Sequence, residues 1–308
     1  MISVRQLRSS PRYWLAAVYI AALAGIFVSV RTFWTPDILF LALFGFFLIL
    51  EQGKRFIVYF LPFVVLLLSY EKLRSLAPRL NQHVHYLTMI RFDTRLFGGH
   101  LPTAWLQQHW YAGHAMWYDF YFYFLYMLHF VAPIVLAVAV WKFRPRNYWT
   151  YVTALVVLSY GAFITYVLFP AAPPWLASSK GLIAPIHRIS SDVWTILGVK
   201  NFSTYYEQLT PNIVAAVPSL HAAYPLLFSL VIGKNWGKRW FWLSLLYPVS
   251  VWVGVVYLGE HYVMDVLLGI VYALVSFWAA PYIIPIIRLL IKKVGGKYPE
   301  SISRWIHD

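Results

Sequence analysis

The amino-acid sequence predicts an all-α polytopic membrane protein, a helix bundle with about eight transmembrane helices and an extracytoplasmic interfacial helical segment. Of its 308 residues, 61% are hydrophobic and 12% are charged, which leaves too little polar surface to cover a water-soluble fold. Aromatic residues make up a further signal at 19%, because their rings favour both membrane interfaces. Apolar runs of a length that crosses about 30 Å of hydrocarbon recur along the chain.

The expected spans are, in order, residues 13–33, 36–51, 55–71, 115–141, 149–169, 212–233, 240–259 and 262–285. The first follows Arg5, Arg8 and Arg12 in the manner of a signal peptide, but it is too long and lacks a small-residue cleavage site, so we expect a retained helix. The second and third are short and predict a tight hairpin between Glu51 and Arg55. The fifth ends at Pro170, which cannot continue a helix.

Positive charge gives the orientation, because Lys and Arg near helix ends stay preferentially in the cytoplasm. Placing the N-terminus inside puts 16 of the 25 Lys and Arg residues on the cytoplasmic side, in segments 1–12, 52–55, 142–146, 234–239 and 288–304. Both termini are then cytoplasmic. The net charge of +14 is mainly a topology signal, with contact to anionic lipid as a second contribution. We find no nucleic-acid motif, and the absence of Cys excludes disulfides and thiolate chemistry.

This orientation divides the chain into four parts: N-terminal transmembrane helices (1–71), an extracytoplasmic interfacial segment (72–114), a membrane core (115–287) and a cytoplasmic tail (288–308). In the interfacial segment, the stretch from Arg91 to His100 predicts an amphipathic helix followed by a glycine turn. In the core, we expect Asp119 and His129 to make structural hydrogen bonds, and Trp175 to anchor the protein at the membrane interface.

Two late motifs concentrate the ionisable side chains, Pro218-Ser219-Leu220-His221 and the stretch from Gly259 to Asp265. We expect His221 two to three turns into the sixth span and His261 at the start of the last one, so both histidines lie in the outer half of the bundle. His261 and Asp265 are four residues apart and share a helix face. The carboxylate can fix the tautomer of His261, and His221 can protonate a leaving oxygen. Polar packing between helices is the alternative.

The spacing of these motifs, Pro-Ser-x-His and then His-x-x-x-Asp about forty residues later, resembles the type 2 phosphatidic acid phosphatase superfamily. The Pro-Ser-Leu-His form and the Ala172-Pro173-Pro174-Trp175 element look most like the branch that contains fungal inositol phosphorylceramide synthase. The resemblance covers roughly residues 85–280 and makes 115–287 the catalytic core. It implies that His261 forms a phosphohistidine, that Asp265 orients it and that His221 is the general acid. It also implies that neither a metal nor a cofactor is needed.

Two basic motifs of the phosphatase branch are not intact in this chain. Ala137 stands where a Lys would precede Arg144-Pro145, and Gly254-Val255 stands where a Ser-Arg pair would precede the last motif. A phosphoryl transition state needs positive charge or hydrogen-bond donors on its equatorial oxygens, so these must come from elsewhere. The outer-face candidates are Lys180, Arg188, Arg91, Arg95 and His100, with Ser219 as a hydrogen-bond donor. Contact with water or lipid headgroups is the alternative for each cation.

The sequence therefore predicts a lipid phosphotransferase with an extracytoplasmic active site, a membrane lipid as substrate and no nucleic-acid partner. A lipid phosphate or polyprenyl pyrophosphate phosphatase shares the first chemical step and differs in using water as acceptor. Two hypotheses of another class stay open. One is a lipid transporter or scramblase in which buried His and Asp relay protons, and the other is a non-catalytic scaffold.

Overall fold

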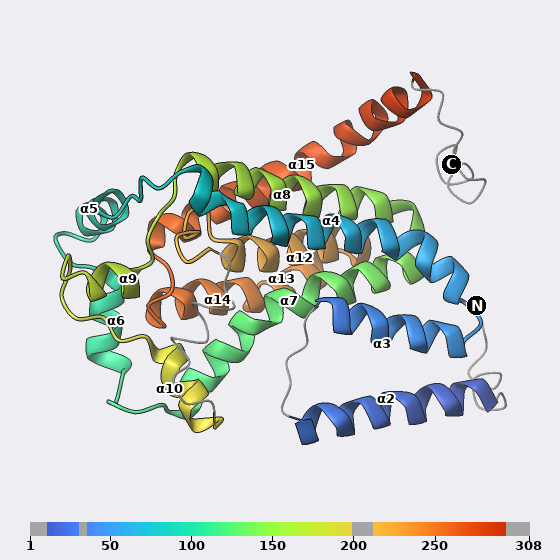
Figure 1. Ribbon diagram of the computed structural model, residues 1–308, viewed down its shortest axis with the longest axis horizontal. Coiled ribbons are helices and arrows are strands. Elements are labelled where there is room, and N and C mark those ends of the chain that lie inside the picture. Colours follow the sequence, from blue (N-terminus) through green and yellow to red (C-terminus); the bar gives the residue numbers. More distant parts are fainter. Residues whose placement is uncertain (1–10, 31–35, 199–211, 294–308) are drawn as a thin grey trace. The chain divides into compact units, whose positions relative to one another are not determined.

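The computed structural model describes residues 11–30, 36–198 and 212–293, and in this part of the chain every regular element is a helix (Figure 1). The all-α class predicted from composition is therefore confirmed. Some residues used to predict the topology lie outside the described part, namely Arg5, Arg8, Arg31, Lys200 and the tail residues 294–308.

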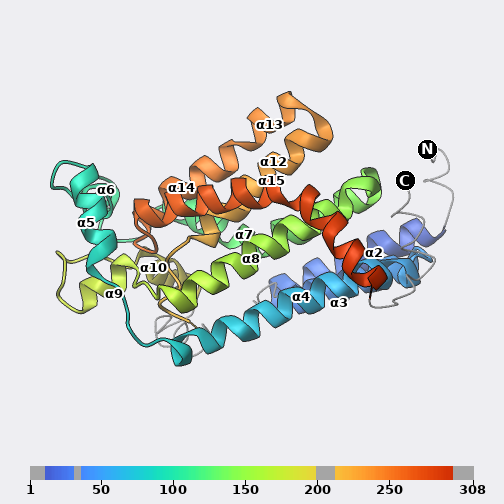
Figure 2. The same cartoon turned by 90° about the horizontal axis from the view of Figure 1, so that it is seen from above.

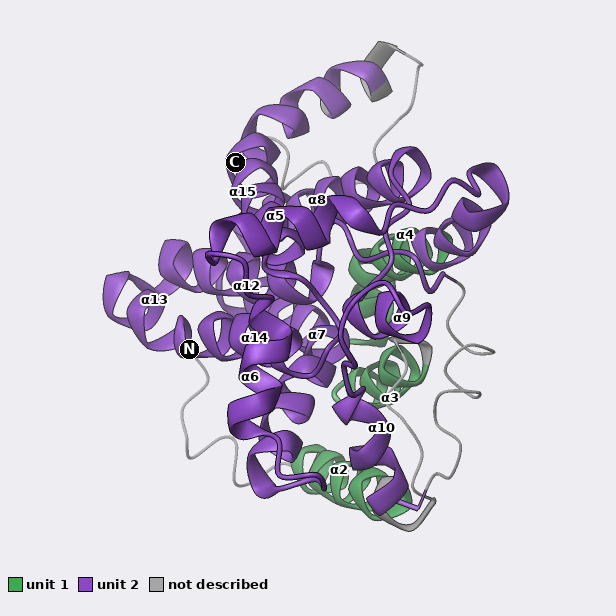
Figure 3. Cartoon of the chain, turned by 90° about the vertical axis from the view of Figure 1, so that its left-hand side faces the viewer, with its two compact units in different colours: residues 1–69 green, residues 70–308 purple. Residues whose placement is uncertain are grey.

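The chain forms two compact units, residues 1–69 and 70–308 (Figure 3). Unit 1 contains α2 (Pro11–Val30), α3 (Pro36–Ile49) and the first part of α4 (Gly53–Leu80). The hydroxyl of Tyr19 donates to the carbonyl of Ala42 at 3.2 Å and connects α2 to α3. Stacked phenylalanine rings form the contact between α3 and α4, with the Phe47 and Phe56 centroids 5.0 Å apart.

Unit 2 contains the last part of α4 and the remaining helices. These are α5 (Leu87–Leu96), α6 (Pro102–Trp110), α7 (Trp117–Phe143), η1 (Pro145–Asn147), α8 (Tyr148–Leu168), α9 (Pro174–Ser179), α10 (Ile189–Ile196), α12 (Leu220–Trp236), α13 (Lys238–Ser244), α14 (Leu246–Tyr257) and α15 (Val263–Lys293). The predicted interfacial helix corresponds to α5. The predicted glycine turn follows it, at Gly98 and Gly99, whose φ angles are positive, 62° and 94°.

Within the described residues, five helical stretches are long and apolar enough to cross a membrane. They are Gly53–Leu80, Trp117–Phe143, Pro145–Leu168, Lys238–Tyr257 and Val263–Ile287. Two of the other three predicted spans contain a shorter apolar helix, in α2 and α3, and the third contains the 17-residue α12. The membrane bundle is thus confirmed, while the count of eight spans stays a prediction. Two helices run past their predicted ends, since α4 continues to Leu80 and α15 to Lys293.

The predicted start of the sixth span is wrong. We expected His221 two to three turns into a helix that begins at residue 212, but α12 begins at Leu220, so His221 lies in its first turn. The preceding segment is extended, because its backbone pairs with the segment after α8: Ala171 donates to Val214 at 2.8 Å and Ala216 donates to Ala171 at 3.2 Å. These non-local bonds replace the helical ones.

Helix α12 lies at the centre of unit 2 and packs against α7, α8, α14 and α15, and α15 also packs along α8 (Figure 2). The close approach of α15 to the start of α12 depends on Gly269. A Cβ atom there would lie 2.4 Å from the carbonyl oxygen of Ser219. The short helices α5, α6, α9 and α10 gather at the end of unit 2 where α12 and α15 begin (Figure 1). Both histidine motifs are found at this end.

Candidate active site

The two histidines meet, as the sequence predicted. Nδ1 of His221 lies 3.0 Å from Nε2 of His261, and Nδ1 of His261 lies 3.3 Å from Oδ2 of Asp265. The Asp265 side chain is fully buried and His261 is 4% exposed. Because a carboxylate only accepts, we assign the proton of His261 to Nδ1, which leaves a lone pair on Nε2 and makes His221 Nδ1–H the donor between the rings. We call these three residues the histidine relay.

The relay is held together by backbone bonds between the starts of two helices. The N–H of Ser219 donates to the carbonyl of Asp265 at 3.0 Å, and the Ser219 hydroxyl caps α12 by accepting the N–H of Ala222 at 3.2 Å. A further bond to the backbone comes from the Asp265 side chain, whose Oδ2 accepts the N–H of Tyr262 at 2.9 Å. The cap leaves the hydroxyl hydrogen of Ser219 available, so its predicted role toward phosphate stays a prediction.

Asp93 is a site residue that the sequence did not reveal. Its two carboxylate oxygens accept the N–H groups of Val263 and Met264 at 2.8 and 3.0 Å, and so cap the first turn of α15. Asp93 is fully buried, and this burial raises its pKa to about 6. The sequence contained one indication of this role: Asp93 follows the apolar Met89 by four residues, so on a helix it lies on the same face as Met89, which is the buried face of α5.

Aromatic rings surround His221. Tyr126 stacks on it with a centroid distance of 4.1 Å, and His129 packs edge-on, also at 4.1 Å. His129 Nδ1–H donates to the carbonyl of Tyr126 at 2.7 Å, which fixes its ring. The hydrogen bonding predicted for His129 is thus present, but its contact with His221 was not foreseen. Asp119 accepts the Tyr257 hydroxyl at 2.6 Å, which is structural hydrogen bonding as predicted.

Arg188 is the candidate cation that the structure brings beside the relay. Its Nε and Nη2 atoms lie 3.0 and 3.3 Å from the two carboxylate oxygens of Glu260, the residue directly before His261. The Ser190 hydroxyl donates to the same carboxylate at 2.5 Å. The guanidinium lies 4.1 Å from the ring centre of Trp175, so this Trp packs on a cation. Glu260 therefore balances the charge of Arg188.

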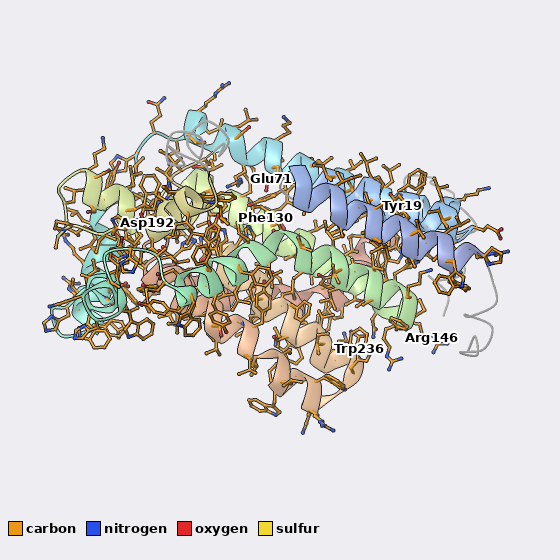
Figure 4. The ribbon with its side chains drawn as sticks, turned by 90° about the horizontal axis from the view of Figure 1, so that it is seen from below. Tyr19, Glu71, Phe130, Arg146, Asp192 and Trp236 are labelled. Carbon is orange, nitrogen blue, oxygen red and sulfur yellow. The ribbon has the colours of Figure 1, made fainter. Side chains whose placement is uncertain are left out.

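The loop that carries Arg188 is held by Gln107 on α6. The side chain of Gln107 donates to the carbonyls of His187 and Tyr257 at 2.8 and 2.9 Å, and it accepts the N–H of His187 at 2.9 Å. Asp192 on α10, labelled in Figure 4, lies 2.8 Å from Nε2 of His187 and accepts the Tyr111 hydroxyl at 2.5 Å. This network fixes the edge of the site through side chains from three segments.

The other four candidates lie apart from the relay. Lys180, Arg91, Arg95 and His100 are exposed, and none has a contact with the histidines within the described part of the chain. Their role toward phosphate stays a prediction.

Arg74 is a second residue that the sequence did not nominate. It pairs with Glu71 on α4, with Nε and Nη2 at 3.2 and 2.9 Å from one carboxylate oxygen. Arg74 is among the charged groups near His221 and His129. The available signal was an acidic and a basic residue three positions apart, directly after the apolar run of the third span.

The relay and its supporting residues lie within the region that a known family covers. The sequence model of the PAP2 superfamily matches residues 87–279. The chain belongs to the PAP2 superfamily. Membership confirms the resemblance that the two motifs indicated over residues 85–280. It makes this PAP2 protein an enzyme of the lipid phosphotransferase and phosphatase class, and its apolar helices make it a multi-pass integral membrane protein.

Three relatives carry related names. A phosphoinositol dihydroceramide synthase of Bacteroides thetaiotaomicron is 28% identical over 242 residues, which are 73% of this chain and 76% of the relative. An inositol phosphorylceramide synthase of Candida albicans is 26% identical over 170 residues, 51% of this chain and 34% of the relative. Inositolphosphotransferase 1 of Saccharomyces cerevisiae is 30% identical over 111 residues, 32% and 20% of the two chains. No solved structure matches this chain.

Proposed function

We propose that this PAP2 protein transfers a phosphoinositol-type headgroup from a phospholipid to the hydroxyl of a ceramide-type lipid. The observation that carries the proposal is the histidine relay, in which an imidazole nitrogen with a free lone pair faces a second imidazole that holds a proton. The names of the three relatives support the substrate class, and the bacterial relative aligns over 76% of its own length.

In the first step, Nε2 of His261 attacks the phosphorus of the donor. The bond from phosphorus to the diacylglycerol oxygen breaks. His221 enters this step as an imidazolium, protonated on both ring nitrogens, and gives its Nδ1 proton to that oxygen, which leaves His221 as a neutral imidazole. Phosphorus is then bonded to His261, whose positive charge Asp265 stabilises. Nδ1 of His221 and Nε2 of His261 are 3.0 Å apart in the resting site, so the two rings separate to admit the phosphoryl group.

In the second step, the ceramide hydroxyl gives its proton to His221 while its oxygen attacks phosphorus. The bond from phosphorus to Nε2 of His261 breaks, which restores both histidines. His221 lies in the first turn of α12, and His261 lies two residues before α15. The partial positive charge at both helix starts therefore stabilises the phosphate oxygens.

Burial at the relay favours transfer over hydrolysis. His261 is 4% exposed and Asp265 is fully buried, so bulk water has little access to a phosphohistidine. Water as acceptor gives the lipid phosphatase, which is the second outcome of the same chemistry.

We place the relay on the extracytoplasmic side. It lies at the start of α12, and Lys234 lies 13 residues further along the same helix, a rise of about 20 Å. The basic segments 142–146 and 234–239 favour the cytoplasm. Because the chain contains no Cys, Lys180→Cys and Lys238→Cys report sidedness directly. A membrane-impermeant maleimide added to intact cells should label the first variant and not the second. The reverse pattern would overturn this orientation.

The test of function is headgroup transfer by purified protein in detergent with a chelator present. The donors are phosphatidylinositol, phosphatidylserine and phosphatidic acid, each with and without ceramide. We expect chelator-resistant, ceramide-dependent turnover of phosphatidylinositol that is lost in His261→Ala and kept in His114→Ala, a matched change at an exposed histidine. Phosphate release without ceramide would identify a phosphatase. Equal turnover in His261→Ala would remove the proposed nucleophile, and a folded wild type that is inactive on every lipid would favour the scaffold.

A further inference from the structure

The histidine relay needs a cation for the phosphate oxygens, and the basic motifs that supply it in the phosphatase branch are not intact here. Arg188 lies beside the relay but forms a buried pair with Glu260, and the two side chains are 8% and 5% exposed. Moving that guanidinium onto a substrate would leave the Glu260 carboxylate buried and unbalanced next to His261, which is unfavourable. Another cation is therefore expected at the site.

The outer part of α4 lies beside the motif that contains His221. Tyr70 is 3% exposed and its hydroxyl bonds to Tyr166 on α8. The Tyr166 hydroxyl in turn donates to the carbonyl of Pro218 at 3.0 Å. Pro218 is three residues before His221. Two hydroxyl groups thus connect α4 to the segment that starts α12.

The same part of α4 has a second connection further along. The side-chain amide of Asn81, the residue after α4, donates to the carbonyl of Val167 at 2.9 Å, next to the end of α8. Arg74 lies between these two connections. It follows Tyr70 by four residues and so projects from the same face of α4, toward α8 and the motif of His221.

The Arg74 side chain has both the surroundings and the access that an anion site needs. It is 19% exposed, whereas its partner Glu71 is 36% exposed and lies on the more open side. Figure 4 marks Glu71 and also Phe130, the neighbour of His129. Arg74 is among the charged groups near His129 and His221. Its Nε and Nη2 both donate to one oxygen of Glu71. A phosphate offers anionic oxygens to the same two donors, so Glu71 occupies a position that a phosphate can take.

We propose that Arg74 binds the phosphate of the donor phospholipid beside the histidine relay, and that Glu71 orients the guanidinium until the donor arrives. The proposal rests on the proposed function, because it assigns the cation of that same reaction. The ligand class is the phosphodiester of an anionic phospholipid. When it binds, the guanidinium exchanges Glu71 for two phosphate oxygens, and the exposed Glu71 side chain turns to solvent or headgroups.

The first test compares the kinetics of Arg74→Gln, Arg74→Lys and Arg79→Gln. Arg79 is the matched control, since it is exposed in the last turn of the same helix. We expect Arg74→Gln to lower kcat/KM for the donor by about 100- to 1,000-fold and to leave KM for ceramide unchanged. Arg74→Lys keeps the charge but loses the paired geometry, so it should recover part of this loss. Arg79→Gln should stay within about twofold of the wild type. Unchanged donor kinetics in Arg74→Gln would overturn the proposal while leaving the proposed function intact.

The second test measures binding without turnover. Phosphatidylinositol is added to His261→Ala protein, and the rise in melting temperature is compared with that of the His261→Ala/Arg74→Gln double variant. We expect the rise to disappear in the double variant, and to remain when Arg79→Gln is the second change. An equal rise in both double variants would overturn the assignment, whether or not the wild type turns over the lipid. A variant that binds the donor normally but does not transfer the headgroup has an intact phosphate site and a defect in the mechanism, so the two kinds of failure can be told apart.

Discussion

Replacing Asp93 by an asparagine tests the contact between α5 and the start of α15. Burial raises the pKa of Asp93 to about 6 from an ordinary value of 3.8. The folded protein therefore binds the Asp93 proton more tightly than the unfolded chain, and this contribution to stability is present below pH 3.8 and is lost as the pH rises through 6. The difference between the two pKa values corresponds to about 3 kcal/mol.

The amide introduced by Asp93→Asn would keep the shape of the carboxyl group and one acceptor oxygen but cannot ionise. Its weaker cap lowers the free energy of unfolding by an amount that does not depend on pH. The free energy of unfolding of Asp93→Asn, relative to the wild type, should therefore rise by about 2.4 kcal/mol between pH 4 and pH 7. For a unit of this size that is a relative rise in Tm of about 5–10 °C.

The assay is thermal unfolding of both proteins in detergent at pH 4, 5, 6 and 7. Arg95→Gln serves as the control, because Arg95 is exposed on the same helix, and its difference from the wild type should not follow the same curve. A difference between Asp93→Asn and the wild type that is constant over this range would refute the reasoning. So would a wild type that gains stability over the variant as the pH rises.

Three further changes test the geometry around the relay. Asp265→Asn removes the carboxylate charge that fixes the tautomer of His261 and stabilises its positive form, so kcat for transfer should fall about 100- to 10,000-fold with little change in KM. Gly269→Ala places a Cβ atom 2.4 Å from the backbone oxygen of Ser219, and denaturant unfolding should show a loss of about 1–3 kcal/mol. Glu260→Gln leaves a buried Arg188 without its counter-charge and should lower the free energy of unfolding by about 3–5 kcal/mol.

The changes at Gly269 and Glu260 each have a matched control. Gly161→Ala should cost far less than the change at 269, because its Cβ would lie 3.6 Å from the ring of Tyr272. Adding Arg188→Met to Glu260→Gln should recover most of the lost stability, since no unbalanced charge then remains buried. An unchanged kcat in Asp265→Asn would contradict the role given to Asp265. A Glu260→Gln/Arg188→Met protein no more stable than Glu260→Gln would contradict the account of the buried pair.

Features set by local spacing were predictable from the sequence. Apolar runs located the long helices. The four-residue spacing of His261 and Asp265 predicted their contact correctly, but the two residues do not share a helix face as expected, because α15 begins only at Val263. Their meeting with His221 was predicted because the sixth span runs inward and the seventh returns outward, which brings both histidines to the same end of the bundle. These inferences need only helix periodicity and the thickness of a bilayer.

Features set by non-local pairing were not predictable. The true start of α12 depends on Ala171, more than forty residues earlier, whose backbone holds the preceding segment in an extended form. The cap of α15 comes from Asp93, 170 residues before Val263. Arg188 was nominated because of its charge, but nothing in the sequence indicated that Glu260 would balance it. A single sequence gives the residues that can pair but not the partners that folding brings to them.

The position of Asp265 at the beginning of the last helix has a consequence for biosynthesis. His221 obtains its hydrogen-bonded partner only from the segment that leads into α15, and Ser219 obtains its own from the carbonyl of Asp265. Synthesis proceeds from the N-terminus, so a growing chain carries the first histidine for some time without the second. Under the proposed mechanism, a chain can react with lipids only after the final helix has been inserted and has packed against α12, and incompletely made chains cannot carry out the transfer.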